Sequence, residues 1–161
     1  AGIFINQRGR EAQGIVDVGP DYEQLVEELA AKLTGLKDPD GREDGQVAVY
    51  EAIPRQKAYS GPYVDTAPDL IVGYNVGYRV SWDAAVGKCG RHVFTDNTKA
   101  WSGDHCVHPD LVPGVVFSNL KLKGDQANII DIAPTVLELL GVAKPSYMDG
   151  RSLLCDEPDS S

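Results

Sequence analysis

The strongest constraint on the fold is the alternation of an amphipathic helix pattern with short runs that are apolar on both faces. From Pro20 to Leu36, apolar side chains recur at helical spacing and form one stripe. In the segment 69–74, Asp69 is followed by a continuous apolar run, and turn residues bound the segment. This pattern is typical of a strand covered on both faces. This alternation favours an α/β fold, in which a layered sheet carries flanking helices.

The remaining elements follow from the same patterns. Short runs rich in strand-forming residues predict strands at 3–5, 46–53 and 115–118. A second helix is predicted from Asp131 to Gly141, with the following apolar side chains turned inward: Ile132, Val136, Leu139 and Leu140. No linker divides the chain, so we expect a single α/β unit over residues 1–155 and a polar tail over 156–161.

The charge balance excludes several classes of partner. The chain has 15 Lys and Arg against 24 Asp and Glu, a net charge of −9. An acidic surface repels phosphate backbones and anionic lipids, so we expect neither nucleic-acid wrapping nor membrane binding. No apolar run approaches the roughly 20 residues that span a bilayer. Three cysteines without paired spacing predict no disulfide framework, and the sequence does not indicate a cellular compartment.

The first residue of the chain is also informative. It is Ala1, and Met148 is the only methionine. A translated chain starts with Met, so two explanations stay open: a short leader has been removed, or the chain is the C-terminal piece of a longer protein.

The richest cluster of chemical groups is Trp101–Pro109, inside a long, weakly periodic stretch from 75 to 110. His105, Cys106 and His108 are zinc-type donors, but a self-contained zinc site requires about four ligands. The spacing favours one ligand of a site completed by other segments, and a purely structural loop is the alternative.

Three other groups of residues have a functional and a structural interpretation. Asp65 and Asp69 are either an acid–base pair or turn residues before a strand, which we favour. The Arg8–Glu11 stretch is either a phosphate site or a charged turn, and it lacks the spaced glycines of a phosphate loop. No motif nominates an activated nucleophile. The aromatic residues form either a substrate cleft or a satellite core under the long loop: Tyr59, Tyr63, Tyr74, Tyr78, Trp82 and Trp101.

Several stretches together resemble the C-terminal part of the alkaline phosphatase superfamily, and most closely its type I phosphodiesterase/nucleotide pyrophosphatase branch. The resemblance covers Ile3 to Leu154. Its more particular motifs are Gly9-Arg10-Glu11 and Trp101-Ser102-Gly103-Asp104-His105. The other matching motifs are Ala67-Pro68-Asp69-Leu70-Ile71-Val72-Gly73, Val112-Pro113-Gly114-Val115-Val116-Phe117-Ser118-Asn119, Asp131-Ile132-Ala133-Pro134-Thr135 and Met148-Asp149-Gly150-Arg151-Ser152-Leu153.

The resemblance implies a specific chemistry. Enzymes of this superfamily use two divalent metal ions, commonly zinc, and a Thr, Ser or modified Cys nucleophile. The late histidine ligand of the family matches His105. The resemblance implies that Asp104 lies beside this ligand without binding the metal itself. His108 has no clear counterpart and is left out. The nucleophile and the other metal ligands belong to earlier parts of the family, and their motifs are not found here.

The resemblance therefore implies the C-terminal fragment of a metal-dependent phosphodiesterase/nucleotide pyrophosphatase-like hydrolase. The parent would act on a small phosphoester substrate, and we expect the fragment to be inactive without the missing N-terminal part of its own domain. Two alternatives stay open. One is a separate, non-catalytic binding domain with the same fold. The other is a fragment of a relative of the sulfatases or of the cofactor-independent phosphoglycerate mutases.

Overall fold

The computed structural model describes residues 1–41, 45–101, 103, 107–123 and 127–155. It divides into two compact units, with the boundary between Pro113 and Gly114. Each unit is described by itself below. The single unit expected over residues 1–155 stays a prediction about the assembled domain.

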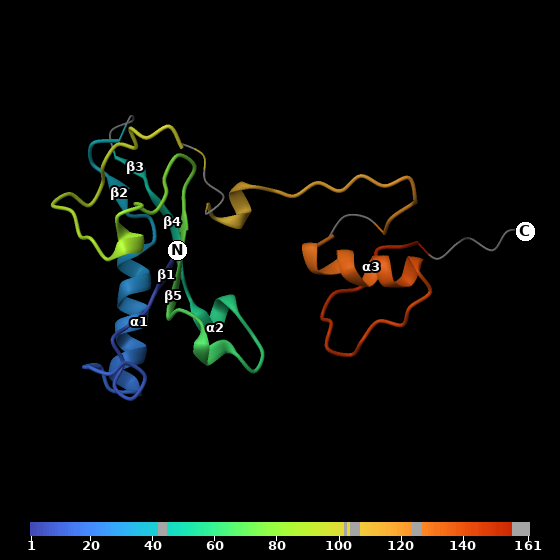
Figure 1. The fold of residues 1–161 in the computed structure, drawn as a ribbon, viewed down its shortest axis with the longest axis horizontal. Helices are drawn as coiled ribbons and strands as arrows, with labels where there is room; N and C mark the ends of the chain where they lie inside the picture. The colour runs from blue at the N-terminus through green and yellow to red at the C-terminus, as the bar shows by residue number, and fades with distance from the viewer. Residues whose placement is uncertain (42–44, 102, 104–106, 124–126, 156–161) are drawn as a thin grey trace, which may run out of the picture. The chain divides into compact units, whose positions relative to one another are not determined.

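The first unit is built on a three-stranded antiparallel sheet (Figure 1). Its strand order is β1 (Gly2–Ile3), β5 (Leu70–Tyr74) and β4 (Val49–Pro54). A smaller antiparallel pair joins β2 (Lys37–Asp38) to β3 (Gln46–Val47). The strand predicted over 46–53 is therefore two strands. The mixture of helix and strand agrees with an α/β fragment, whereas these small sheets do not establish the predicted layering.

Helix α1 (Pro20–Leu33) supplies the apolar stripe that covers this sheet (Figure 1). The buried core joins Ile5, Tyr22 and Val26 to Leu70 of β5. Pro20 occupies the start of the helix, as the sequence predicts, because its missing N–H costs nothing there. The helix ends three residues earlier than expected.

The rest of the first unit consists of turns and loops around the sheet. Helix α2 (Arg55–Ala58) follows β4 directly. The residues that the structure describes after α2 form 3₁₀ turns at η1 (Val64–Thr66), η2 (Ala84–Val86) and η3 (Pro109–Leu111). Within the described part of residues 75–110, regular strand pairing is limited to one isolated bridge between Val107 and Tyr74.

The described part of the second unit contains one α-helix, as the sequence predicts. A 3₁₀ turn, η4 (Ile129–Asp131), runs into α3 (Ile132–Leu139), and the helix is followed by Gly141 at a φ of 67°. The turn begins with a capping box, in which Asn128 and Asp131 each accept from the other end of the turn.

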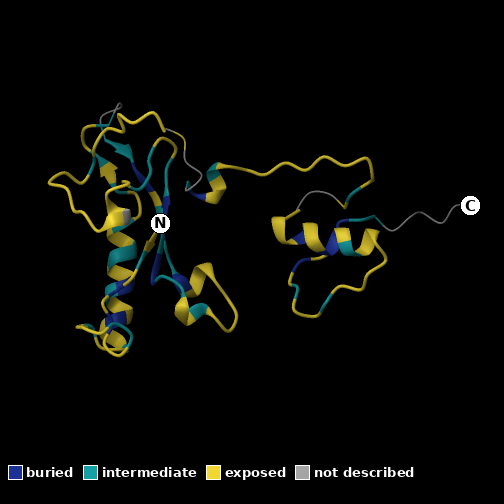
Figure 2. Ribbon diagram, viewed as in Figure 1, coloured by how far each residue is buried: buried dark blue, intermediate teal, exposed yellow. Residues whose placement is uncertain are grey.

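The predicted burial of this helix is wrong. Figure 2 shows α3 largely exposed, and its apolar residues are 38% to 70% exposed: Ile132, Val136, Leu139 and Leu140. The buried groups of the described second unit are instead Asp131, Thr135 and Leu153, with Pro134 and Gly150. Gly150 is required here because a Cβ at this position would lie 2.1 Å from the carbonyl oxygen of Ile130.

The strand predicted over 115–118 is also absent from the structure. Val115 is 83% exposed and Phe117 is 92% exposed, and their segment is not in a strand. A strand that is apolar on both faces needs neighbours on its edges and its faces. The described residues of the second unit supply only one strand-like bridge, between Leu122 and Leu154.

Among the described residues, no helix is both long enough and apolar enough to cross a membrane.

Candidate functional site

The candidate loop, residues 101–108, is held to the first unit at each end of its described part. The carbonyl oxygen of Gly103 accepts a hydrogen bond from Arg79 at 3.3 Å, and the Arg79 guanidinium lies 4.6 Å over the Trp82 ring. At the other end, the N–H of His108 donates to the carbonyl oxygen of Tyr74 at 2.9 Å. His105, the predicted metal ligand, lies outside the described residues, as do Asp104 and Cys106.

His108 is the functional candidate that the sequence did not select. Its side chain is buried between strands, and the residue is only 3% exposed. The ring lies 4.5 Å from the Tyr50 ring, and Nε2 lies 3.1 Å from a carboxylate oxygen of Glu51. Sequence spacing could not reveal this position, because Tyr50 and Glu51 come from a strand more than fifty residues earlier.

Hydrogen bonding sets the tautomer of His108. The N–H of Asp110 donates to Nδ1 at 3.3 Å, so Nδ1 is the acceptor nitrogen. Neutral His108 therefore carries its proton on Nε2, which faces Glu51. The approach to Glu51 is within ion-pair distance, but Nε2 makes no hydrogen bond of accepted geometry. The side chain is held mainly by burial and by its contacts with both strands.

The described residues do not form a metal centre. None of their His, Cys, Asp and Glu side chains gather in a group of three that could hold an ion. Two-metal chemistry requires several such donors around each ion. The part of the chain that the structure describes therefore provides no metal centre of its own, and the assignment of His105, which lies outside that part, stays a prediction.

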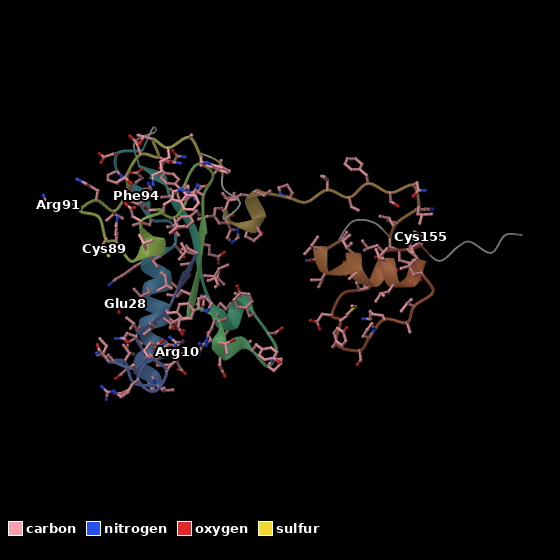
Figure 3. The ribbon with its side chains drawn as sticks, viewed as in Figure 1. Arg10, Glu28, Cys89, Arg91, Phe94 and Cys155 are labelled. Atoms are coloured by element: carbon pink, nitrogen blue, oxygen red, sulfur yellow. The ribbon has the colours of Figure 1, made fainter. Side chains whose placement is uncertain are left out.

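The aromatic residues of the long loop do not form a satellite core. Trp82, Trp101 and Tyr63 are 50%, 79% and 78% exposed. An open groove of about 330 Å³ lies beside β1, and Trp82 is the only one of the six predicted aromatic residues that lines it. Tyr78 packs edge-on against Phe94, whose place in the loop Figure 3 shows. The described residues therefore do not gather these rings into one substrate cleft.

Asp69 is the centre of a buried charge cluster in the first unit. Its carboxylate is fully buried and accepts two hydrogen bonds from Arg10, at 2.7 and 2.9 Å. It also accepts from the Tyr22 hydroxyl at 2.6 Å and from the Ile5 N–H at 2.7 Å. A second guanidinium, that of Arg55, lies 3.2 Å away. We call these five residues the Asp69 cluster; Figure 3 shows Arg10 near the start of α1.

The cluster fixes the protonation state of its members. Burial raises the pKa of Asp69, but the hydrogen bonds from Arg10 and Tyr22 outweigh burial and hold this pKa at about 2. Burial and the hydrogen bond to Asp69 raise the pKa of Tyr22 to about 12. Asp69 is therefore ionised at neutral pH and has no proton to exchange, and the side chain of Asp65 is 95% exposed. An acid–base pair of these two residues is not supported.

The Arg8–Glu11 stretch also has a structural role. The Nε of Arg10 donates to Glu11 at 2.7 Å, and the other oxygen of Glu11 accepts from the N–H of Gln7 at 2.7 Å. Asp69, Glu11 and the Ile5 carbonyl occupy four of the five N–H donors of Arg10, so the guanidinium does not present a free pair of donors to a phosphate. The charged turn favoured by the sequence is confirmed.

Acid titration offers a test of the Asp69 cluster. The pKa of Asp69 is near 3.8 in an unfolded chain and about 2 when folded, so its contribution to stability is complete above pH 4. We expect Asp69 to account for about 2 kcal/mol of the fall in the free energy of unfolding as the pH drops from 4.5 to below 2. Urea unfolding across this range measures it. The Asp69→Asn variant lacks the group, so an equally steep fall in that variant would contradict the assignment.

Comparison with known proteins gives a partial answer. No protein-family model matches the chain, and no solved structure matches it. Part of the chain is similar to the 2,3-bisphosphoglycerate-independent phosphoglycerate mutase 2 of Methanosarcina barkeri, with 42% identity over 52 residues, which are 31% of this chain and 10% of the relative. The corresponding mutase of Wolbachia pipientis wMel is 46% identical over 52 residues, again 31% of this chain and 10% of the relative.

A longer match extends to the mutase of Picosynechococcus sp., at 33% identity over 72 residues, 38% of this chain and 13% of the relative. The chain thus matches about a tenth of the length of these curated relatives. The mutases are members of the alkaline phosphatase superfamily, and the matches do not show the nucleotide pyrophosphatase branch. About a third of the chain is therefore similar to members of that superfamily.

Proposed function

We propose that the chain is one part of a metal-dependent phosphoryl-transfer enzyme of the alkaline phosphatase superfamily. The observation that carries this proposal is its 42% identity to a phosphoglycerate mutase over 52 residues. Because the match covers 10% of that relative, the activity belongs to a longer polypeptide, of which these residues would be one portion.

Two reactions are candidates for that polypeptide. The matches favour a phosphoglycerate mutase relative, which would move a phosphoryl group between positions of a phosphoglycerate. The motifs Gly9-Arg10-Glu11 and Trp101–His105 favour the phosphodiesterase/nucleotide pyrophosphatase-like hydrolase instead. Both reactions would use a pair of divalent metal ions, which polarise a phosphoryl oxygen and activate the attacking group when bound.

Within this proposal, His105 is one ligand of the metal pair, and zinc is the metal that the resemblance implies. Support comes from its neighbours in the sequence, because the described residues Gly103 and His108 both bond to the first unit. The remaining donors would come from the N-terminal part of the same catalytic domain. The exposed apolar residues Val115 and Phe117 are consistent with such a partner, since isolated units do not ordinarily expose this much apolar surface in one segment.

The test is a His105→Ala variant in the longer protein. We expect bound zinc and turnover to fall together, because one protein ligand is lost from the metal pair. Two assays separate the candidates: interconversion of 2- and 3-phosphoglycerate, and hydrolysis of bis(p-nitrophenyl) phosphate. His92→Ala is the matched control, since His92 is exposed on the same long stretch. Unchanged metal content and rate in His105→Ala would refute the assignment.

The 161-residue chain by itself provides a second measurement. We expect it to hold no stoichiometric zinc and to have no activity in either assay. Stoichiometric zinc with phosphodiesterase turnover would show a self-sufficient centre and contradict the proposal. A separate, non-catalytic binding domain is the remaining alternative, and it predicts a gene whose initiator codon stands directly before the codon of Ala1.

A further inference from the structure

The backbone of β5 meets the ring of His108 at Gly73. A Cβ added to Gly73 would lie 2.6 Å from Cδ2 and 3.2 Å from Cγ of His108, which is closer than side chains tolerate. Glycine inside a strand often marks a place where another segment approaches closely. Gly73 is therefore needed for His108 to lie against the sheet.

The segment 107–108 also completes an edge of the sheet. Strand β1 pairs with β5 up to Val72, where Ala1 donates to the Val72 carbonyl at 2.9 Å and accepts from the Val72 N–H at 2.7 Å. The next carbonyl on that edge belongs to Tyr74, and it accepts from the N–H of His108 at 2.9 Å. Residues 107–108 thus occupy the length of β5 that β1 leaves unpaired.

Several elements enclose the His108 ring. Tyr50 and Glu51 approach from β4, Gly73 from β5, and the Asp110 N–H bonds to Nδ1 from the following turn. The ring is consequently fixed in position and in orientation. Because neighbouring residues are linked at fixed covalent distances, a fixed His108 also restricts where the adjoining residues can lie.

We propose that His108 is a positioning residue, which anchors residues 107–108, the described end of the candidate loop, to β5 by packing against Gly73. The anchor itself follows from the contacts of His108 alone. Its importance for catalysis rests on the proposed function, because His105 precedes His108 by three residues, and a stretch of that length reaches at most about 11 Å. The anchor therefore limits where this candidate ligand can stand.

A double-mutant cycle in the full chain tests the anchor. The readout is amide exchange at His108, Asp110, Leu111 and Val112, compared with the amides of α1. We expect Gly73→Ala and His108→Ala each to speed exchange in this local group about tenfold, while α1 is unchanged. Adding Gly73→Ala to His108→Ala should add less than twofold, because the clashing ring atoms are already gone.

Two further variants separate anchoring from general destabilisation. His108→Asn retains an acceptor near the Asp110 N–H and should restore part of the local protection. His92→Ala, at an exposed histidine, should change nothing. Equal acceleration in α1, or additive effects of Gly73→Ala and His108→Ala, would overturn the anchor.

In the longer protein, His108→Ala should weaken zinc affinity about tenfold to a hundredfold, as loss of a supporting residue around a metal ligand does. Chelator competition measures this without any turnover assay. Local loss of exchange protection without any zinc binding by the parent protein would uphold the anchor and refute the proposed function. Unchanged zinc affinity in a zinc-binding parent would overturn the positioning role.

Discussion

Replacing Asp69 by Ala should lower the free energy of unfolding of the first unit by about 3–5 kcal/mol. The substitution removes a fully buried carboxylate and leaves the guanidinium groups of Arg10 and Arg55 with only their outer partners, Glu11 and the exposed Asp65. Removing one partner of a buried ion pair costs more than the pair itself contributes, because the remaining charge stays desolvated. Urea unfolding followed by far-UV circular dichroism measures the change.

Asp65→Ala is the matched control for that experiment. Asp65 also pairs with Arg55, at 3.6 Å, but its side chain is 95% exposed. Exposed pairs contribute roughly 0–1 kcal/mol, so this variant should unfold almost like the original chain. If Asp69→Ala were as mild as Asp65→Ala, the Asp69 cluster would not be the centre of stability that its geometry indicates.

Leu153→Ala should have the second largest effect, this time on the second unit. Among the described residues of that unit, Leu153 is the only large hydrophobic side chain that is fully buried, at 1% exposure. Its N–H donates to the Thr135 hydroxyl at 3.0 Å, and its carbonyl accepts from Lys123. Truncating a buried Leu typically costs about 2–5 kcal/mol, which is more than a unit with so small a core can lose.

Thermal unfolding monitored at α3 would show this loss, and Leu139→Ala provides the control. Leu139 lies on α3 itself and is 52% exposed, so the same chemical change removes little buried surface there. Alanine also has the higher helix propensity. Equal losses in the two variants would mean that Leu153 is not the core of this unit.

The helices could be predicted from sequence because their signals are local. The stripe that starts at Pro20 and the glycine that follows α3 both describe a few consecutive residues, and both predictions are confirmed. Burial could not be predicted in the same way. The apolar residues of 115–118 fit a covered strand, yet covering requires neighbours that the described residues of the second unit do not supply.

The candidate site also combines features that local sequence predicts with features that depend on distant contacts. The turn role of the Arg8–Glu11 stretch followed from its composition, whereas the convergence of Arg10, Tyr22 and Arg55 on Asp69 depends on pairings across the whole first unit. His108 is among the zinc-type donors of its cluster but is left out of the predicted site, because it has no clear counterpart in the family that the sequence resembles. The available signal was Gly73, a glycine inside an otherwise apolar strand pattern, which indicates that something lies close to it.

The Asp69 cluster also has a kinetic consequence. Its donors come from positions 64, 59 and 47 residues before Asp69, so the carboxylate is satisfied only when distant stretches of chain have already met. Long-range closures of this kind slow folding, since their entropy is lost before their contacts form. We therefore expect the cluster to form late in folding. Its contacts should then lower the unfolding rate more than they raise the folding rate.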